Sequence, residues 1–195
     1  MGDSLGAVTF DQLLDQLAAP APAPAGASAA ALIAAMAASL VVMVARGTPA
    51  WPKGATVTRR ASVLRTSLLE LADDDARAVG LLLVATRAPK TTHQAEEFAR
   101  TLKEASKPPL AIAVAAAEIA ELAAEAEKHG KSVMRADAAV AAAIARAATN
   151  SAVLVIEANL NSGPGIATTA ESSDLLRRAR EATLRAKASA TTNEP

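Results

Sequence analysis

The chain has 195 residues, 20 basic and 20 acidic, and 53 of them are Ala while only three are aromatic. Alanine favours helices and is depleted from strands, which excludes a β-sandwich or barrel. The 51% of hydrophobic residues excludes a disordered chain. The balanced charge offers no basic surface to a nucleic-acid partner. With no Cys, and with His93 and His129 at unrelated positions, we expect no disulfide, no metal site and a cytoplasmic setting.

The first predicted helices flank a proline-rich turn. Residues 9–18 predict a short amphipathic helix, because Thr9 can cap it and four large apolar residues share one face. Three prolines between residues 20 and 24 then enforce an extended connection. The next helix begins near Gly26 or Ser28 and ends near residue 46, before a glycine and two prolines.

The middle of the chain predicts four more helices, bounded by proline or glycine. Their ranges are 57–87, 91 or 92 to 106, 110–129 and 133–148. Gly130 is expected to close the third of them in the usual C-terminal position.

The last part of the chain contains one ambiguous segment. Residues 151–160, SAVLVIEANL, suit a buried strand or a helix, and we interpret them as helix because a lone strand has no pairing partner. A loop at 161–165, a helix at 169–188 and a disordered tail at 189–195 follow. We therefore expect one all-α domain over residues 1–188, an up-and-down helical bundle built around an Ala-rich central helix.

The uncharged stretch at residues 25–45 has the length of a membrane span. It consists mostly of Ala, Gly and Ser, which drive insertion weakly compared with Leu or Phe. The preceding Asp3, Asp11 and Asp15 do not match the basic start of a signal peptide. We expect a buried core helix and no membrane partner, with a membrane segment as the alternative.

Two carboxylates interrupt apolar helical stripes: Asp75 follows Leu71 on one stripe, and Asp137 precedes Val140 on another. Both are expected to point into the packed face, where a carboxylate is costly unless paired and its pKa is displaced. Such groups are candidates for acid–base chemistry, and the alternative is a buried salt bridge or a helix cap. The two acidic residues just before Asp75 fall on other faces and are expected to be solvated.

Other polar features are weaker candidates. The turn at residues 22–28, PAPAGAS, leads into a helix whose free N–H groups can bind an anion or a polar ligand, or can simply start the helix. Lys90 lies in a turn between helices and is expected at the surface. Asn159 can orient a ligand or satisfy a buried backbone group.

Taken in order, these features resemble the cyclodeaminase family. This is the cyclodeaminase half of formiminotransferase-cyclodeaminase, which also occurs as stand-alone bacterial proteins, some described as methenyltetrahydrofolate cyclohydrolases. The resemblance rests on PAPAGAS at 22–28, MVARGT at 43–48, LADDDARA at 71–78, ATRAPKTTHQAE at 85–96, AD at 136–137 and NL at 159–160. It covers about residues 8–162.

The resemblance implies an all-α homodimer that holds a folate in a cleft near the dimer interface, with no metal. It implies Asp137 as the main acid–base residue and Asp75 as its partner or as an anchor for the pterin. The residues expected to bind the substrate are Pro24, Gly26, Ser28, Thr48, Lys90 and Asn159.

The implied activity is conversion of formiminotetrahydrofolate to methenyltetrahydrofolate and ammonia, or hydrolysis of methenyltetrahydrofolate. The chain departs from the family at its glycine-rich turn, where Ala25 and Ala27 replace two glycines, and at Ala136, where the family has Ser. A methyl group obstructs a ligand that lies on that backbone. The alternative is therefore a catalytically degenerate homologue with a binding or structural role as a helical dimer.

Overall fold

A computed structural model describes residues 4–20, 23–86, 92–162 and 170–191. Within these residues every regular element is a helix, so the predicted all-α bundle is confirmed. In chain order they are α1 (Phe10–Ala18), α2 (Gly26–Gly47), α3 (Gly54–Thr86), α4 (Thr92–Ala105), α5 (Lys107–His129), the 3₁₀ turn η1 (Ser132–Met134), α6 (Arg135–Asn161) and α7 (Ala170–Thr191).

Local chemistry explains how these helices begin and end. At the start of α1 the predicted cap is present: Thr9 Oγ1 accepts the Gln12 N–H at 3.3 Å, and Gln12 Oε1 accepts the Thr9 N–H at 3.0 Å. Proline occupies the first turn of α5, where its missing N–H costs nothing. The last helix runs to Thr191, so residues 189–191 are helical and the disordered tail predicted there is wrong; residues 192–195 lie outside the described part.

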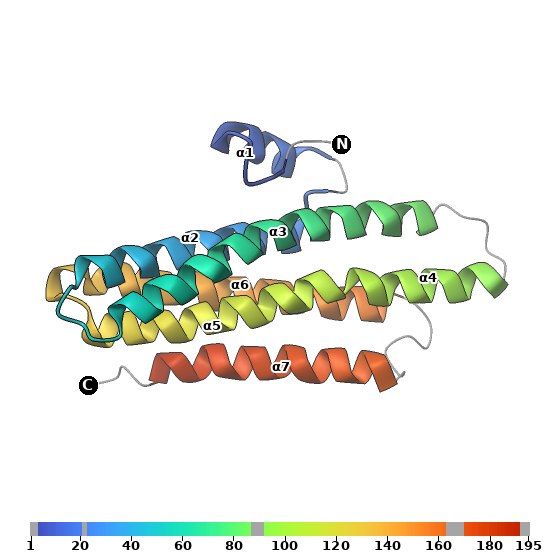
Figure 1. The fold of residues 1–195 in the computed structure, drawn as a ribbon. Coiled ribbons are helices and arrows are strands. Elements are labelled where there is room, and N and C mark those ends of the chain that lie inside the picture. Colours follow the sequence, from blue (N-terminus) through green and yellow to red (C-terminus); the bar gives the residue numbers. More distant parts are fainter. Residues whose placement is uncertain (1–3, 21–22, 87–91, 163–169, 192–195) are drawn as a thin grey trace.

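The helices form an elongated bundle (Figure 1). α3 and α4 form an antiparallel helical hairpin, and α5 runs on from α4 in the same direction. α2 packs against α3, α5 and α6, whereas α7 packs against α5 and α6. α1 lies outside the bundle beside α3, on the opposite side from α7.

Alanine builds most of the core. The buried residues of α2 are Ala27, Ser28, Ala30, Ala31, Ala34, Ala35, Ala37, Ala38, Val41, Val42, Val44 and Ala45, and α5 is lined in the same way. A methyl group lets neighbouring helix axes come close, so each buried position contributes through tight packing more than through its own area. The predicted Ala-rich central helix is α2, and it shares the centre with α5.

α6 differs from its prediction in extent and in orientation. Residues 135–161 form one helix, which confirms the helical interpretation of 151–160 and removes the break expected after residue 148. The buried face consists of small residues such as Ala138, Ala141 and Ala145. Val133 is 83% exposed and Val140 is 50% exposed. The stripe that carries Asp137 therefore lies at the edge of the packed face, contrary to our expectation.

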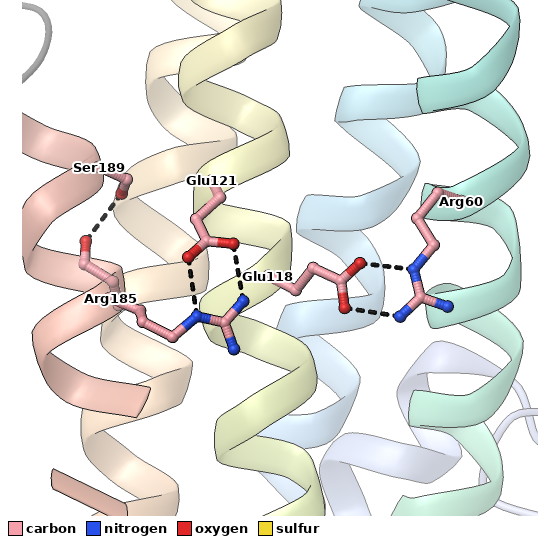
Figure 2. Close-up of polar contacts among 6 residues, drawn as sticks. Arg60, Glu118, Glu121, Arg185 and Ser189 are labelled. Atoms are coloured by element: carbon pink, nitrogen blue, oxygen red, sulfur yellow. Dashed lines mark hydrogen bonds and ion pairs between the residues drawn. The ribbon is translucent and has the colours of Figure 1, made fainter. Parts of the chain in front are cut away.

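Two bidentate ion pairs tie the outer helices to α5 (Figure 2). Glu118 accepts hydrogen bonds from Arg60 of α3 at 2.5 and 2.6 Å. Glu121 accepts from Arg185 of α7 at 2.8 and 2.7 Å. The two glutamates lie one turn apart, so α3 and α7 are held in register with the same part of α5. Because these side chains are partly exposed, each pair contributes at most about 1 kcal/mol.

The α2–α3 turn and the α5–α6 turn meet at one end of the bundle. The buried Thr48 Oγ1 donates to the Val44 carbonyl at 2.9 Å and accepts the Lys131 N–H at 3.1 Å. The Trp51 ring stacks on His129 with centroids 5.7 Å apart. These contacts fix the two turns to each other.

Two of the described helical stretches have the length and composition of a membrane span, Gly26–Gly47 and Ser132–Asn161. In the bundle 67% of the most apolar window of the first stretch is buried, and 44% of that of the second. The burial of α2 agrees with its predicted place in a protein core, and the absence of a membrane partner stays a prediction.

Gly130 ends α5 at the predicted position, but for a different reason. Its backbone is extended (φ −68°, ψ 159°) and not left-handed. A Cβ there would lie 2.5 Å from the Ala126 carbonyl oxygen and 2.8 Å from Val44 Cγ1. The position therefore needs glycine for space and not for its conformational freedom.

We predict that Gly130→Ala lowers the free energy of unfolding by about 1–3 kcal/mol, the usual cost of overpacking. Gly80→Ala is the matched control, because a Cβ at Gly80 of α3 has nothing within 4 Å. In a helix interior that change should stabilise the protein by about 0.5–1 kcal/mol. Urea unfolding measures both, and equal effects would contradict the packing argument.

Candidate functional site

Asp75 is a carboxylate buried between α2 and α3. It occupies the stripe of α3 that also buries Leu64 and Leu68, and only 1% of it is exposed. The fully buried Ser28 of α2 donates its hydroxyl to Asp75 Oδ2 at 2.7 Å. The sequence predicted the burial of Asp75, but not this bond across 47 positions.

The beginning of α2 supplies favourable electrostatics for this carboxylate. No side chain caps α2 and its first turn has no acidic residue, so its N–H groups carry partial positive charge without an anion of their own helix. The backbone of Ser28 also donates a hydrogen bond to Asp75. Asp75, which belongs to α3, therefore supplies the negative charge that the first turn of α2 lacks.

One oxygen of Asp75 has no partner. Oδ1 is buried and accepts no hydrogen bond from the described residues. An unpaired buried polar atom is costly, and such atoms are expected where a ligand or a proton completes the site. A ligand N–H donor or a proton on Oδ1 would satisfy it.

Burial raises the pKa of Asp75 above its ordinary value, and the two Ser28 hydrogen bonds oppose that rise. Desolvation is the larger effect because the charged form loses its water. Asp75 is thus able to hold a proton at a higher pH than an exposed aspartate. This property suits a group that gives and takes protons.

The predicted turn residues Pro24 and Gly26 precede Ser28, the partner of Asp75, by four and two positions. Gly26 is exposed at the first position of α2, and a Cβ there would lie 3.7 Å from Val155 of α6. Pro24 is half-buried just before it. Ala25 has an extended backbone (φ −127°, ψ −163°) that alanine adopts freely. The local backbone therefore does not require the glycines that this chain lacks.

Asp137 and Thr48 lie at the far end of α2. Asp137 is half-buried in the first turn of α6, and the preceding Met134 reaches Gly47 at the end of α2. The 19 steps along the helix from Ser28 to Gly47 span about 28 Å. Within one chain the structure therefore does not bring Asp137 to Asp75, and it places Thr48 in the contact between the two turns.

Of the two remaining candidates, Asn159 lies within the described part of the chain and has its own hydrogen-bond partner. Asn159 is half-buried and its Nδ2 donates to the carbonyl of Ala105 at 3.4 Å, so it satisfies a backbone group at the end of α4. Lys90 lies outside the described residues. The start of α2 with Asp75 is therefore the part of the predicted site that the structure assembles.

Asp73 has a role that the sequence analysis missed. The sequence predicts a solvated side chain, yet its Oδ2 accepts the Ser4 hydroxyl at 2.6 Å and its Oδ1 accepts the Leu5 N–H at 2.8 Å. Leu5 is buried in the core beside this contact. Asp73 thus holds the N-terminal segment on α3, whereas Asp74 pairs with Arg77 at the surface, as expected of a solvated residue.

Among the described residues there is no group of three His, Cys, Asp or Glu side chains that could hold a metal ion. The surface grooves lie between helix pairs such as α3 and α4, or α6 and α7. Because Asp75 is closed to solvent, a ligand can reach it only when the start of α2 or a neighbouring segment moves.

Comparison with known proteins finds a matching family model and a matching fold. The family model described as formiminotransferase-cyclodeaminase matches residues 9–174. A crystal structure of formiminotetrahydrofolate cyclodeaminase from Thermotoga maritima has a TM-score of 0.77, with 19% identity over 95% of this chain and 96% of that one. At that identity the likeness shows a shared fold. No curated protein matches the chain.

The raised pKa of Asp75 predicts an unusual pH dependence of stability. Above about pH 4, where an aspartate in the unfolded chain has lost its proton, the folded protein still binds one. The free energy of unfolding of the wild type, relative to that of Asp75→Asn, should therefore fall as pH rises through this window and level off above the folded pKa.

Urea unfolding of both proteins across pH 3–8 would measure this difference. Glu70→Gln, at an exposed position of α3, controls for the loss of a carboxylate. A relative stability that rises with pH would mean that the folded state favours the charged form of Asp75.

Proposed function

The chain belongs to the formiminotransferase-cyclodeaminase family, and we propose that it acts on a one-carbon unit carried by tetrahydrofolate. The observation that carries the proposal is the buried Asp75, with one unpaired oxygen, at the start of α2. The similar structure from Thermotoga maritima is that of a formiminotetrahydrofolate cyclodeaminase. In this chain Asp75 is a group suited to the same chemistry.

Two reactions fit this site. In cyclodeamination, N10 of 5-formiminotetrahydrofolate bonds to the formimino carbon, the bond from that carbon to the imino nitrogen breaks, and the nitrogen leaves as ammonia after taking up protons. The product carries the 5,10-methenyl bridge. In cyclohydrolysis, water adds to the methenyl carbon and one of its C–N bonds opens. Both reactions need proton transfer beside a cationic one-carbon centre.

Asp75 is the residue we assign to that proton transfer. Its protonated form can give a proton to the leaving nitrogen, and its carboxylate can stabilise the methenyl cation. Ser28 fixes the orientation of the carboxyl group through Oδ2, which leaves Oδ1 for the substrate. Pro24 and Gly26 would contact the substrate from the start of α2. No metal takes part in this proposal.

Two of the remaining predicted residues, Asp137 and Thr48, need a second copy of the chain to reach the substrate. Asp137 can act with Asp75 only if another copy of the chain carries it there, since the two lie at opposite ends of α2 in one copy. The same holds for a contact of Thr48 with the substrate. Asn159 already bonds to α4, and Lys90 is retained as a candidate partner for an acidic part of the folate.

We propose a homodimer that buries the open side of α2 and α6. A Cβ at Gly26 would meet Val155 of α6, and one at Gly47 would meet Met134 of η1, just before α6. Ile33 and Leu40 lie between them at seven-residue spacing, so these four positions share the side of α2 toward η1 and α6. The neighbouring Met36 and Met43 are 54% and 40% exposed. Together with Val140 and Ile144 of α6, these apolar side chains form what we call the α2–α6 face.

The alternative is a helical dimer with a binding or structural role and no turnover. Two observations favour it: alanines replace the glycines at the start of α2, and Asp75 is closed to solvent. Under this alternative the protein binds a folate without converting it, or binds none.

A turnover assay separates these functions. Purified protein is given 5-formiminotetrahydrofolate or 5,10-methenyltetrahydrofolate, while ammonia release and the methenyl bridge are followed. We expect turnover of at least one compound in soluble, detergent-free protein. Binding without turnover would support the degenerate alternative, and neither binding nor turnover would reject the proposed substrate class.

Asp75→Asn should lower kcat by about 10²-fold or more, the usual effect of removing an acid–base group. The exposed Asp74→Asn is the matched control and should keep full activity, because Asp74 lies at the surface, where it pairs with Arg77. Asp137→Asn is measured beside them. A loss as large as that of Asp75→Asn would mean that a second copy brings Asp137 into the site, and retained activity in Asp75→Asn would reject our assignment.

A further inference from the structure

α1 is an amphipathic helix whose apolar face is largely uncovered. None of its residues is buried, while Phe10 is 63% and Leu14 is 48% exposed. Asp11 and Asp15 lie one turn apart beside this face, and residues 10–18 contain no basic residue. The helix thus offers two large apolar side chains next to two negative charges.

A groove between α6 and α7 has the complementary character. Its volume is about 520 Å³, and the exposed Leu154 and Leu184 lie along it. Arg180 and Lys187 stand on either side of Leu184, and neither forms an ion pair with a described residue. The other residues of the lining are Asn150, Val153, Glu157 and Thr183; with the carboxylate of Glu157 the lining has a net charge of +1, against −2 for α1.

The charges of the two surfaces can also be brought side by side. Asp11 and Asp15 lie about 6 Å apart along α1, and Arg180 and Lys187 lie about 10.5 Å apart along α7, a difference that the long cationic side chains can span. A helix that places its apolar face in this groove can set Asp11 and Asp15 beside the two cations. Such a helix-in-groove contact buries apolar area while the charges select the partner.

The α1 helix of the same chain does not reach this groove. Asp73 holds Ser4 and Leu5 on α3, just before α1 begins. Figure 1 places α1 and α7 on opposite sides of the bundle. While this contact is intact, an α1 helix in the groove must therefore come from another copy of the chain.

We propose that α1 of one copy docks into the α6–α7 groove of a second copy. The groove and the α2–α6 face both include residues of α6, so this contact would extend the dimer interface proposed above. In a two-fold dimer it forms twice, since each copy offers one helix and one groove. To exchange α1 in this way, the two-fold axis of the dimer must run along the length of the bundle. The two copies are then parallel, so Asp137 of the second copy stays at the end of the dimer away from Asp75.

Cysteine cross-linking tests the contact directly, because the chain has no Cys of its own. Leu14→Cys protein is mixed with Leu184→Cys protein and oxidised mildly. We expect a disulfide between the two chains. The matched control pairs Leu14→Cys with Val63→Cys, an exposed position of α3, and should give none. A disulfide within a single chain carrying both Leu14→Cys and Leu184→Cys would overturn the proposal.

Charge reversal tests its selectivity. Asp11→Lys with Asp15→Lys should weaken the dimer at least about tenfold in sedimentation equilibrium. Adding Arg180→Glu and Lys187→Glu should restore it, which shows that the first pair of changes did not unfold α1. Arg59→Glu with Arg65→Glu on α3 should have no effect.

A dimer insensitive to these reversals, or a monomer at micromolar concentration, would reject the docking. Neither the cross-linking nor the sedimentation measurement involves a folate. The docking can therefore be confirmed when the proposed activity is rejected, and it can be rejected when the activity is confirmed. A loss of activity in Asp137→Asn would contradict the axis that the docking requires.

Discussion

Close contact between alanine-lined helices is the constraint on which the rest of this structure depends. α2 and α5 bury mainly methyl groups, so their backbones lie near one another and near α6. Such a core has little spare volume, and the Val44 methyl beside Gly130 leaves no room for a Cβ. The same closeness lets a side chain as short as Ser28 reach Asp75 on the next helix.

This closeness also explains how a carboxylate is tolerated inside the bundle. Asp75 loses its water when α2 and α3 meet, yet it gains the hydroxyl and the backbone N–H of Ser28 at a helix start. These bonds compensate only part of the desolvation, and Oδ1 is left unpaired. A well-packed apolar side chain would stabilise the fold more, so the aspartate is better explained by chemistry than by stability.

The sequence predicted the helices well and the site in part. Proline and glycine mark most helix ends, and the leucines of α3 mark the stripe that buries Asp75. On α6 the same reasoning failed for Asp137, because alanines occupy the buried face and the larger Val140 lies at its edge. Whether two candidates meet depends on how the helices cross, and spacing along one helix does not contain that information.

The stacking of Trp51 on His129 has a consequence for how this protein can be observed. The chain has one Trp and no Tyr, so its tryptophan emission comes entirely from the α2–α3 turn. That turn is about 28 Å along α2 from Ser28. A ligand that binds near Ser28 and alters the emission would thus reveal a change transmitted to this end of the bundle. Circular dichroism averages all the helices, so its unfolding curve coincides with that of the emission only if the bundle unfolds as one unit.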